Sequence, residues 1–97
     1  MKILICGDVM GKSGRRAVEA YVPTLREKLG LDFVVVNGEN AAHGFGITEK
    51  MCDAFFDLGV DVITTGNHVW DQREIMNYIG DEPRLLRPIN YPEHTPG

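Results

Sequence analysis

Polar side chains that could bind a metal ion or transfer a proton follow three short apolar runs of the sequence. Gly7-Asp8 follows the first run, Asn37-Gly38-Glu39-Asn40 follows the second, and Gly66-Asn67-His68 follows the third. Carboxylate, amide and imidazole donors together are typical of manganese, iron or zinc sites rather than of thiolate sites. The pattern therefore indicates a metal-dependent reaction centre.

Each of these residues also has an ordinary explanation when it is taken alone. Asp8 could form a turn or cap a helix, and Asn67 is a common turn former. Glu39 and Asn40 could be solvated loop residues, and His68 could be structural. Their coincidence after three runs favours a shared site, because ligands bind outside the carboxyl ends of the strands in an open α/β sheet.

The loop that contains Gly11-Lys12-Ser13 raises an alternative function. The spacing from Gly7 to Gly11 is one residue too short for a P-loop. A nucleotide- or phosphate-binding α/β module without catalysis remains an alternative, with the start of the following helix as its anion site. A phosphate bound there, with no metal near Asp8, would favour that alternative. A non-catalytic interaction protein is a further alternative.

Alternating strands and helices must position these loops. Apolar runs predict strands at residues 2–6, 32–37 and 61–65, with a weaker fourth in 85–90. Helical spacing predicts helices at residues 14–30, 48–59 and 70–80, with Pro23 as a kink or irregular turn in the first. The second run is typical of a strand that is buried on both faces. This order predicts an α/β fold with parallel strands and right-handed crossovers.

Length and composition limit the class of protein. The 97 residues suit one small domain, and 43% of them are hydrophobic, as in a globular protein. The net charge is −4 with no basic block, which argues against a general nucleic-acid-binding surface. No apolar stretch predicts a membrane span or a signal peptide. Cys6 and Cys52 lack a CxxC spacing and are expected to be buried free thiols, so we expect a cytoplasmic protein.

Three motifs in order, GDVMG, NGENAAHGFGIT and GNHVWD, resemble those of the YmdB-like bacterial metallophosphoesterases, a branch of the calcineurin-like phosphoesterase superfamily. The resemblance runs from Met1 to the final RPINYPEHTPG and covers the whole chain. It implies an αββα sandwich, of which this chain supplies about the first half. It also implies a two-metal phosphodiesterase that hydrolyses 2′,3′-cyclic nucleotides.

The resemblance implies a role for each candidate residue. Asp8 and Asn40 would bind the first metal, and Glu39 would bridge both metals. Asn67 would bind the second metal, and His68 would be the general acid while a metal-bridging hydroxide attacks phosphorus in line. The expected cofactors are two divalent or mixed-valence ions, with iron or manganese favoured over zinc.

Other features of the sequence qualify this resemblance. His43, in the glycine-rich loop after Asn40, is a weaker candidate for substrate contact. Val69 stands where the wider superfamily has a carboxylate after the histidine, and the metal-binding histidines of the family's second half have no counterpart. We therefore expect residues 1–97 to be the N-terminal part of a metallophosphoesterase domain, weakly active or inactive alone. We expect it to form a homo-oligomer or to bind a complementary C-terminal fragment.

Overall fold

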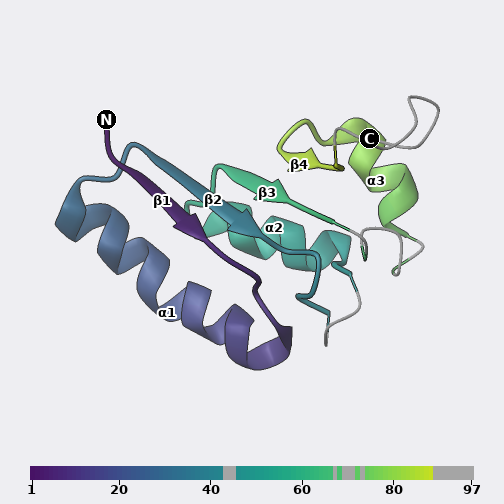
Figure 1. Cartoon of the computed structure of the whole chain (residues 1–97), viewed down its shortest axis with the longest axis horizontal. Coiled ribbons are helices and arrows are strands. Elements are labelled where there is room, and N and C mark those ends of the chain that lie inside the picture. The colour runs from purple at the N-terminus through teal and green to yellow at the C-terminus, as the bar shows by residue number, and fades with distance from the viewer. Residues whose placement is uncertain (43–45, 67, 69–71, 73, 89–97) are drawn as a thin grey trace.

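The computed structural model describes residues 1–42, 46–66, 68, 72 and 74–88. Strands and helices alternate along the chain (Figure 1), in the order β1 (Ile3–Cys6), α1 (Gly11–Leu29), β2 (Phe33–Asn37), α2 (Glu49–Asp57), β3 (Val62–Thr64), α3 (Ile75–Asp81) and β4 (Leu85–Leu86). The strands and helices predicted from the sequence are therefore present, and the weaker fourth strand is the short β4.

The helices differ from the predicted ranges mainly at their first residues. α1 begins at Gly11, before the predicted Gly14, and it continues through Pro23 without interruption. It ends where Gly30 adopts a left-handed conformation, with φ 62°, and donates its N–H to the carbonyl of Arg26. The side chain of Thr48 caps α2 by accepting the N–H of Met51 at 3.2 Å. None of the described helices combines the length and apolarity that a membrane crossing needs.

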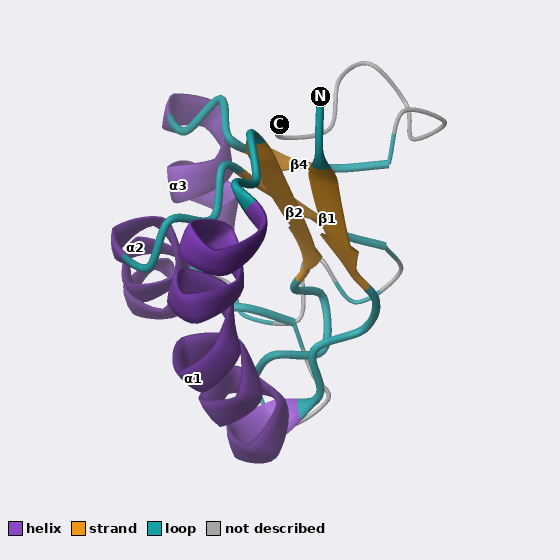
Figure 2. Ribbon diagram, turned by 90° about the vertical axis from the view of Figure 1, so that its left-hand side faces the viewer, coloured by secondary structure: helices purple, strands orange, loops and turns teal. Residues whose placement is uncertain are grey.

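All the strands run parallel in one sheet of order β1-β2-β3-β4. In this register Val35 of β2 lies between Ile5 of β1 and Val62 of β3. Each crossover moves one strand along in the same direction, so crossovers of one hand put every helix on the same face. Figure 2 shows this arrangement, with α1, α2 and α3 all on one side of the strands.

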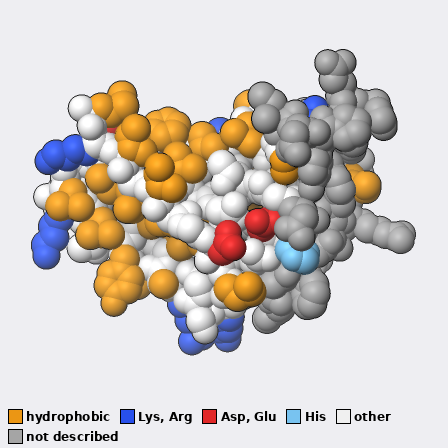
Figure 3. All heavy atoms as spheres, in the orientation of Figure 1, with side chains coloured by type: hydrophobic (Ala, Val, Ile, Leu, Met, Phe, Trp, Pro, Cys, Tyr) orange, Lys and Arg blue, Asp and Glu red, His pale blue; other side chains and the backbone are white. Residues whose placement is uncertain are grey.

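The two faces of the sheet are therefore buried to different degrees. Val34 and Val36 of β2 point toward the helices and are fully buried. On the opposite face Ile3, Ile5 and Phe33 expose 53%, 74% and 37% of their surface, and apolar side chains gather over β1 and β2 in Figure 3. The predicted burial of the second strand on both faces is wrong for the described chain, because all its helices lie on one face.

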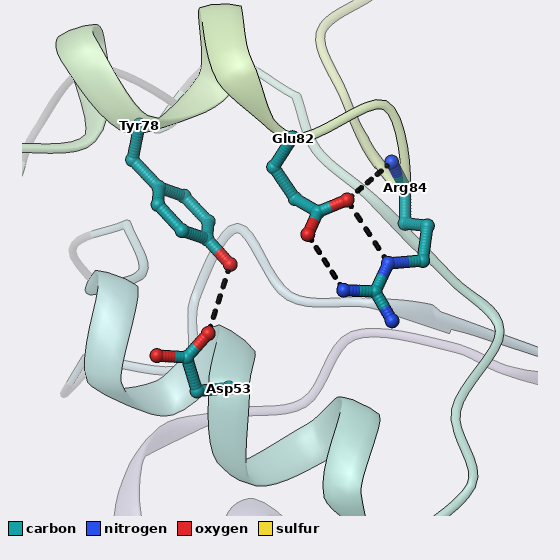
Figure 4. A network of polar contacts seen from close by, with 4 residues as sticks. All are labelled: Asp53, Tyr78, Glu82 and Arg84. Carbon is teal, nitrogen blue, oxygen red and sulfur yellow. Dashed lines mark hydrogen bonds and ion pairs between the residues drawn. The ribbon is translucent and has the colours of Figure 1, made fainter.

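Contacts of Tyr78 and Arg84 hold α3 and the turn before β4 against α2, and Figure 4 shows the polar ones. The hydroxyl of Tyr78 donates a hydrogen bond to Asp53 at 3.0 Å. Burial raises the pKa of Tyr78, and the bond to Asp53 raises it further, so the hydroxyl stays protonated at neutral pH. Arg84 forms an ion pair with Glu82 at 2.6 Å and lies 3.9 Å from the centre of the Phe56 ring. These contacts fix the position of α3 beside α2.

Asp61 connects β2, α1 and the turn before β3. Its Oδ2 accepts the N–H of Val34 at 2.8 Å and an Nη1 hydrogen of Arg26 at 2.7 Å. The N–H of Asp61 in turn donates to the carbonyl of Val34 at 2.9 Å. Arg26 also donates to the carbonyl of Gly59 at 2.7 Å. One carboxylate thus holds the end of α1 against the sheet.

Replacing Asp61 tests this connection. Asp61→Ala should lower the free energy of unfolding by about 1–3 kcal/mol, because the N–H of Val34 and the guanidinium of Arg26 lose their shared acceptor. Urea denaturation followed by circular dichroism measures the change. The control is Asp81→Ala, an exposed carboxylate at the end of α3, which should change the stability by less than about 0.5 kcal/mol. Equal losses in the two variants would contradict the assigned role of Asp61.

Candidate active site

The loops after β1, β2 and β3 meet at one edge of the sheet, because the three strands are parallel (Figure 1). The N–H of Val9 donates to the carbonyl of Asn37 at 3.1 Å, which links the loop after β1 to the end of β2. The N–H of Gly38 donates to the carbonyl of Thr64 at 2.9 Å, which links the loop after β2 to the end of β3. Backbone hydrogen bonds therefore bring these three loops together.

Glu39 reaches from the loop after β2 to the loop after β3. Its Oε2 accepts the backbone N–H of His68 at 3.3 Å. The carboxylate lies against Gly66 so closely that an added Cβ there would be 2.3 Å from Oε2 and 2.6 Å from Oε1. The backbone N–H of Glu39 donates to Oδ1 of Asn37 at 3.2 Å. Gly66 leaves the space that allows Glu39 and His68 to meet.

Asn40 and Asp8 occupy different environments at the same edge. Asn40 is buried, with 7% of its surface exposed, and its carbonyl accepts the N–H of Gly11 at 3.0 Å. Asp8 is exposed directly after β1. Burial raises the pKa of the nearby Cys6 thiol. Asp8, Glu39 and Asn40 offer oxygen donors at this edge, and Figure 3 shows acidic side chains beside a histidine on this part of the surface.

Two predicted site residues, Asn67 and His43, lie outside the described residues. Within the described part of the chain, no three His, Cys, Asp or Glu side chains form a group that could hold a metal ion. The ligand set predicted from the sequence differs from such a group, because it combines the carboxylates of Asp8 and Glu39 with amide side chains. The structure places Glu39 in contact with His68, with Asn40 next to Glu39 in the loop after β2 and Asp8 in the loop after β1.

The contact of Glu39 with Gly66 and His68 was not predicted from the sequence. The signal for it is Gly66 itself, a glycine directly before the polar pair at the end of a strand. A glycine at that position fits an ordinary turn equally well, and only the fold brings it next to a side chain from another loop. This bond holds the backbone of His68, so it does not replace the carboxylate missing at Val69, which would orient the imidazole.

Comparison with known families identifies the chain. The family model described as YmdB-like protein matches residues 4–97. The chain belongs to the YmdB-like family. Over 97 residues it is 53% identical to the 2′,3′-cyclic-nucleotide 2′-phosphodiesterase of Bacillus subtilis strain 168, and the match covers 100% of this chain and 37% of that protein. The predicted family is thus confirmed, and this YmdB-like chain spans little more than a third of that relative.

Two solved structures have the same fold as this YmdB-like chain. A hypothetical protein from Thermus thermophilus superposes with a TM-score of 0.91 at 40% identity, covering 100% of this chain and 37% of that one. A structure described as a novel phosphatase of Mycoplasma pneumoniae gives a TM-score of 0.90 at 35% identity, covering 100% and 36%. These likenesses confirm the predicted α/β fold of parallel strands that alternate with helices.

An alanine at position 66 tests how Glu39 is held. In Gly66→Ala the new Cβ should displace the carboxylate of Glu39 and break its hydrogen bond to His68. The stability should fall by less than about 1 kcal/mol, because the end of a flexible side chain can move aside. The backbone amide signal of His68 in an ¹⁵N–¹H NMR spectrum should shift as it does in Glu39→Ala.

The matched control is Gly80→Ala in α3, where an added Cβ meets no atom within 4 Å. That variant should leave the His68 amide signal in place. A His68 signal that is unchanged in Gly66→Ala would mean that Glu39 does not accept this N–H.

Proposed function

We propose that the protein containing this chain is a metal-dependent phosphodiesterase that hydrolyses 2′,3′-cyclic nucleotides. The structural observation that carries the proposal is the hydrogen bond between Glu39 and His68, which joins a candidate metal ligand to a candidate acid. The Bacillus subtilis relative, named a 2′,3′-cyclic-nucleotide 2′-phosphodiesterase, supports the substrate class. Because the chain spans 37% of that relative, the activity is proposed for the whole protein.

The donors at the sheet edge fit hard metal ions. Asp8 and Glu39 offer carboxylates and Asn40 offers an amide oxygen, a set that suits manganese or iron and is compatible with zinc. The hydrogen bond from His68 orients the Glu39 carboxylate, as partners of metal ligands commonly do. In this proposal Asp8 and Asn40 hold one metal, Glu39 serves both, and Asn67 holds the other. The bound metals would supply an activated water at neutral pH and would neutralise charge on the phosphate.

His68 would act as the general acid. Its backbone bond to Glu39 keeps it beside the proposed metal ligands, where the phosphate would bind. As the bond between phosphorus and the ribose 2′ oxygen breaks, the imidazole would donate a proton to that oxygen. The oxygen would then leave as a hydroxyl, and the phosphate would stay on the 3′ oxygen. His43 remains a proposed substrate contact, supported by its place in the loop after Asn40.

The uncovered sheet face supports the proposed partners. Ile3, Ile5 and Leu86 expose 53%, 74% and 44% of their surface. Apolar patches of this kind promote association, so a second copy or a complementary C-terminal fragment is the proposed partner. The thiols of Cys6 and Cys52 are free, which supports a cytoplasmic location because thiols stay reduced there.

Two substitutions in the full-length protein separate the proposed roles. His68→Ala should lower turnover of 2′,3′-cyclic AMP by about 10²–10⁴-fold, the usual contribution of general acid–base catalysis, while metal content is retained. Glu39→Ala should lose metal, because a carboxylate that serves both ions is removed. Metal analysis of the purified variants, together with steady-state kinetics, measures both effects.

Two further variants sharpen the result. Glu39→Gln keeps an acceptor for the His68 N–H but removes the charge, so it should lose metal as Glu39→Ala does, which assigns the loss to the charge rather than to the hydrogen bond. Glu27→Ala, an exposed carboxylate on α1, should match the unmodified protein in turnover and metal content. Equal metal loss in His68→Ala and Glu39→Ala would make His68 a ligand rather than the acid.

A further inference from the structure

A groove between α1 and α2 is separate from the candidate active site. Its volume is about 610 Å³, within the range of roughly 300–1,000 Å³ that is typical of small-molecule sites. None of its lining residues belongs to the set Asp8, Glu39, Asn40, Gly66 and His68. The floor is apolar and comes from α2 and its last turn, from Met51, Ala54, Phe55 and Leu58.

Arg15 lines this groove, and its side chain carries a hydrogen-bond donor that has no acceptor among the described residues. Its Nε is buried from solvent and makes no hydrogen bond to the described part of the chain. A buried donor without an acceptor is unfavourable, and more so on a charged group, because its interaction with water is lost and nothing replaces it. Such a group calls for an acceptor from outside the described chain.

The charges in the groove are arranged along the helices. Arg15 lies in the second turn of α1, and Lys50 is the second residue of α2. α1 and α2 both begin near the carboxyl ends of parallel strands, so their first turns lie at the same end of the groove (Figure 1). Arg15 and Lys50 are near these helix starts and therefore lie toward that end. Glu19 follows Arg15 by one turn, and Asp57 is the last residue of α2, so the carboxylates lie further along.

We propose that this groove binds a small organic anion, with its acidic group on Arg15 and Lys50 and its apolar body on Met51 and Phe55. Because the Nε is closed off from solvent here, the Arg15 side chain would have to turn for its Nε–H to reach an anionic oxygen in the groove. The bond gained would be charge-assisted, and such bonds are stronger than neutral ones. The apolar body would cover the floor, and Glu19 and Asp57 would disfavour a ligand whose negative charge extends along the groove. This inference does not depend on the proposed phosphodiesterase activity.

The experiment uses benzoate as the probe, with benzyl alcohol as an uncharged analogue of similar shape. The ¹⁵N–¹H signal of the Arg15 Nε–H in the full chain should shift saturably with benzoate, with a Kd of about 1 mM, as expected for so small a ligand. Arg15→Gln should raise the Kd of benzoate at least about tenfold. In this variant the Kd is measured from the backbone amide signals of Met51 and Phe55. The matched control is Arg16→Gln, which changes an exposed neighbour that does not line the groove and should leave the Kd unchanged.

Three results would overturn the proposal. The first is equal affinity for benzoate and benzyl alcohol, because the cations would then have no role. The second is a benzoate Kd that is the same in Arg15→Gln as in the unmodified protein. The third is a groove that is already filled by a second copy, seen as protection of the Arg15 Nε–H that rises with protein concentration without ligand. None of these measurements uses phosphodiesterase turnover, so failure here leaves the proposed function to its own test.

Discussion

The position of the Glu39 carboxylate, between the Cα of Gly66 and the backbone N–H of His68, is the contact on which the candidate active site depends. It joins two loops that are separated in the sequence by a helix and a strand. Without it, the Glu39 carboxylate and the backbone of His68 would lose the hydrogen bond that joins their loops. A side chain larger than hydrogen at position 66 would occupy the same space. The contact therefore depends on one glycine as much as on the charged residue.

The direction of the strands makes this contact available. Parallel strands in sequential order bring every loop of interest to one edge of the sheet, and they place every helix on one face. The connection of Asp61 with Val34 and Arg26 keeps α1 against that sheet, and the bond from Gly11 to Asn40 ties the first residue of α1 to the loop after β2. The same order leaves an apolar face uncovered by the described chain. The topology that brings the three loops together thus also creates the surface on which the proposed partner would bind.

The sequence was sufficient to predict the fold class, the order of elements and the family. These follow from apolar runs, from glycines that end helices and from motifs, all of which can be recognised along the chain. It was also sufficient to predict that Asp8, Glu39 and His68 follow strand ends. It did not show that Gly66 makes room for a carboxylate from another loop, since that depends on the register between β2 and β3. The expected burial of β2 on both faces was wrong because β-branched residues indicate a strand without indicating which elements cover it. The buried Nε of Arg15 depends on how α1 and α2 pack, which no local pattern encodes.

Anomalous diffraction at the manganese edge, from a crystal of the full-length protein soaked in manganese, tests the central claim most directly. We expect a peak beside the Glu39 carboxylate, with side-chain oxygens of Asp8 and Asn40 directed toward the same site. We also expect the backbone N–H of His68 to donate to Glu39 in that crystal. Manganese bound only elsewhere, with Glu39 turned away from Gly66 and from any metal, would contradict the proposed metal site.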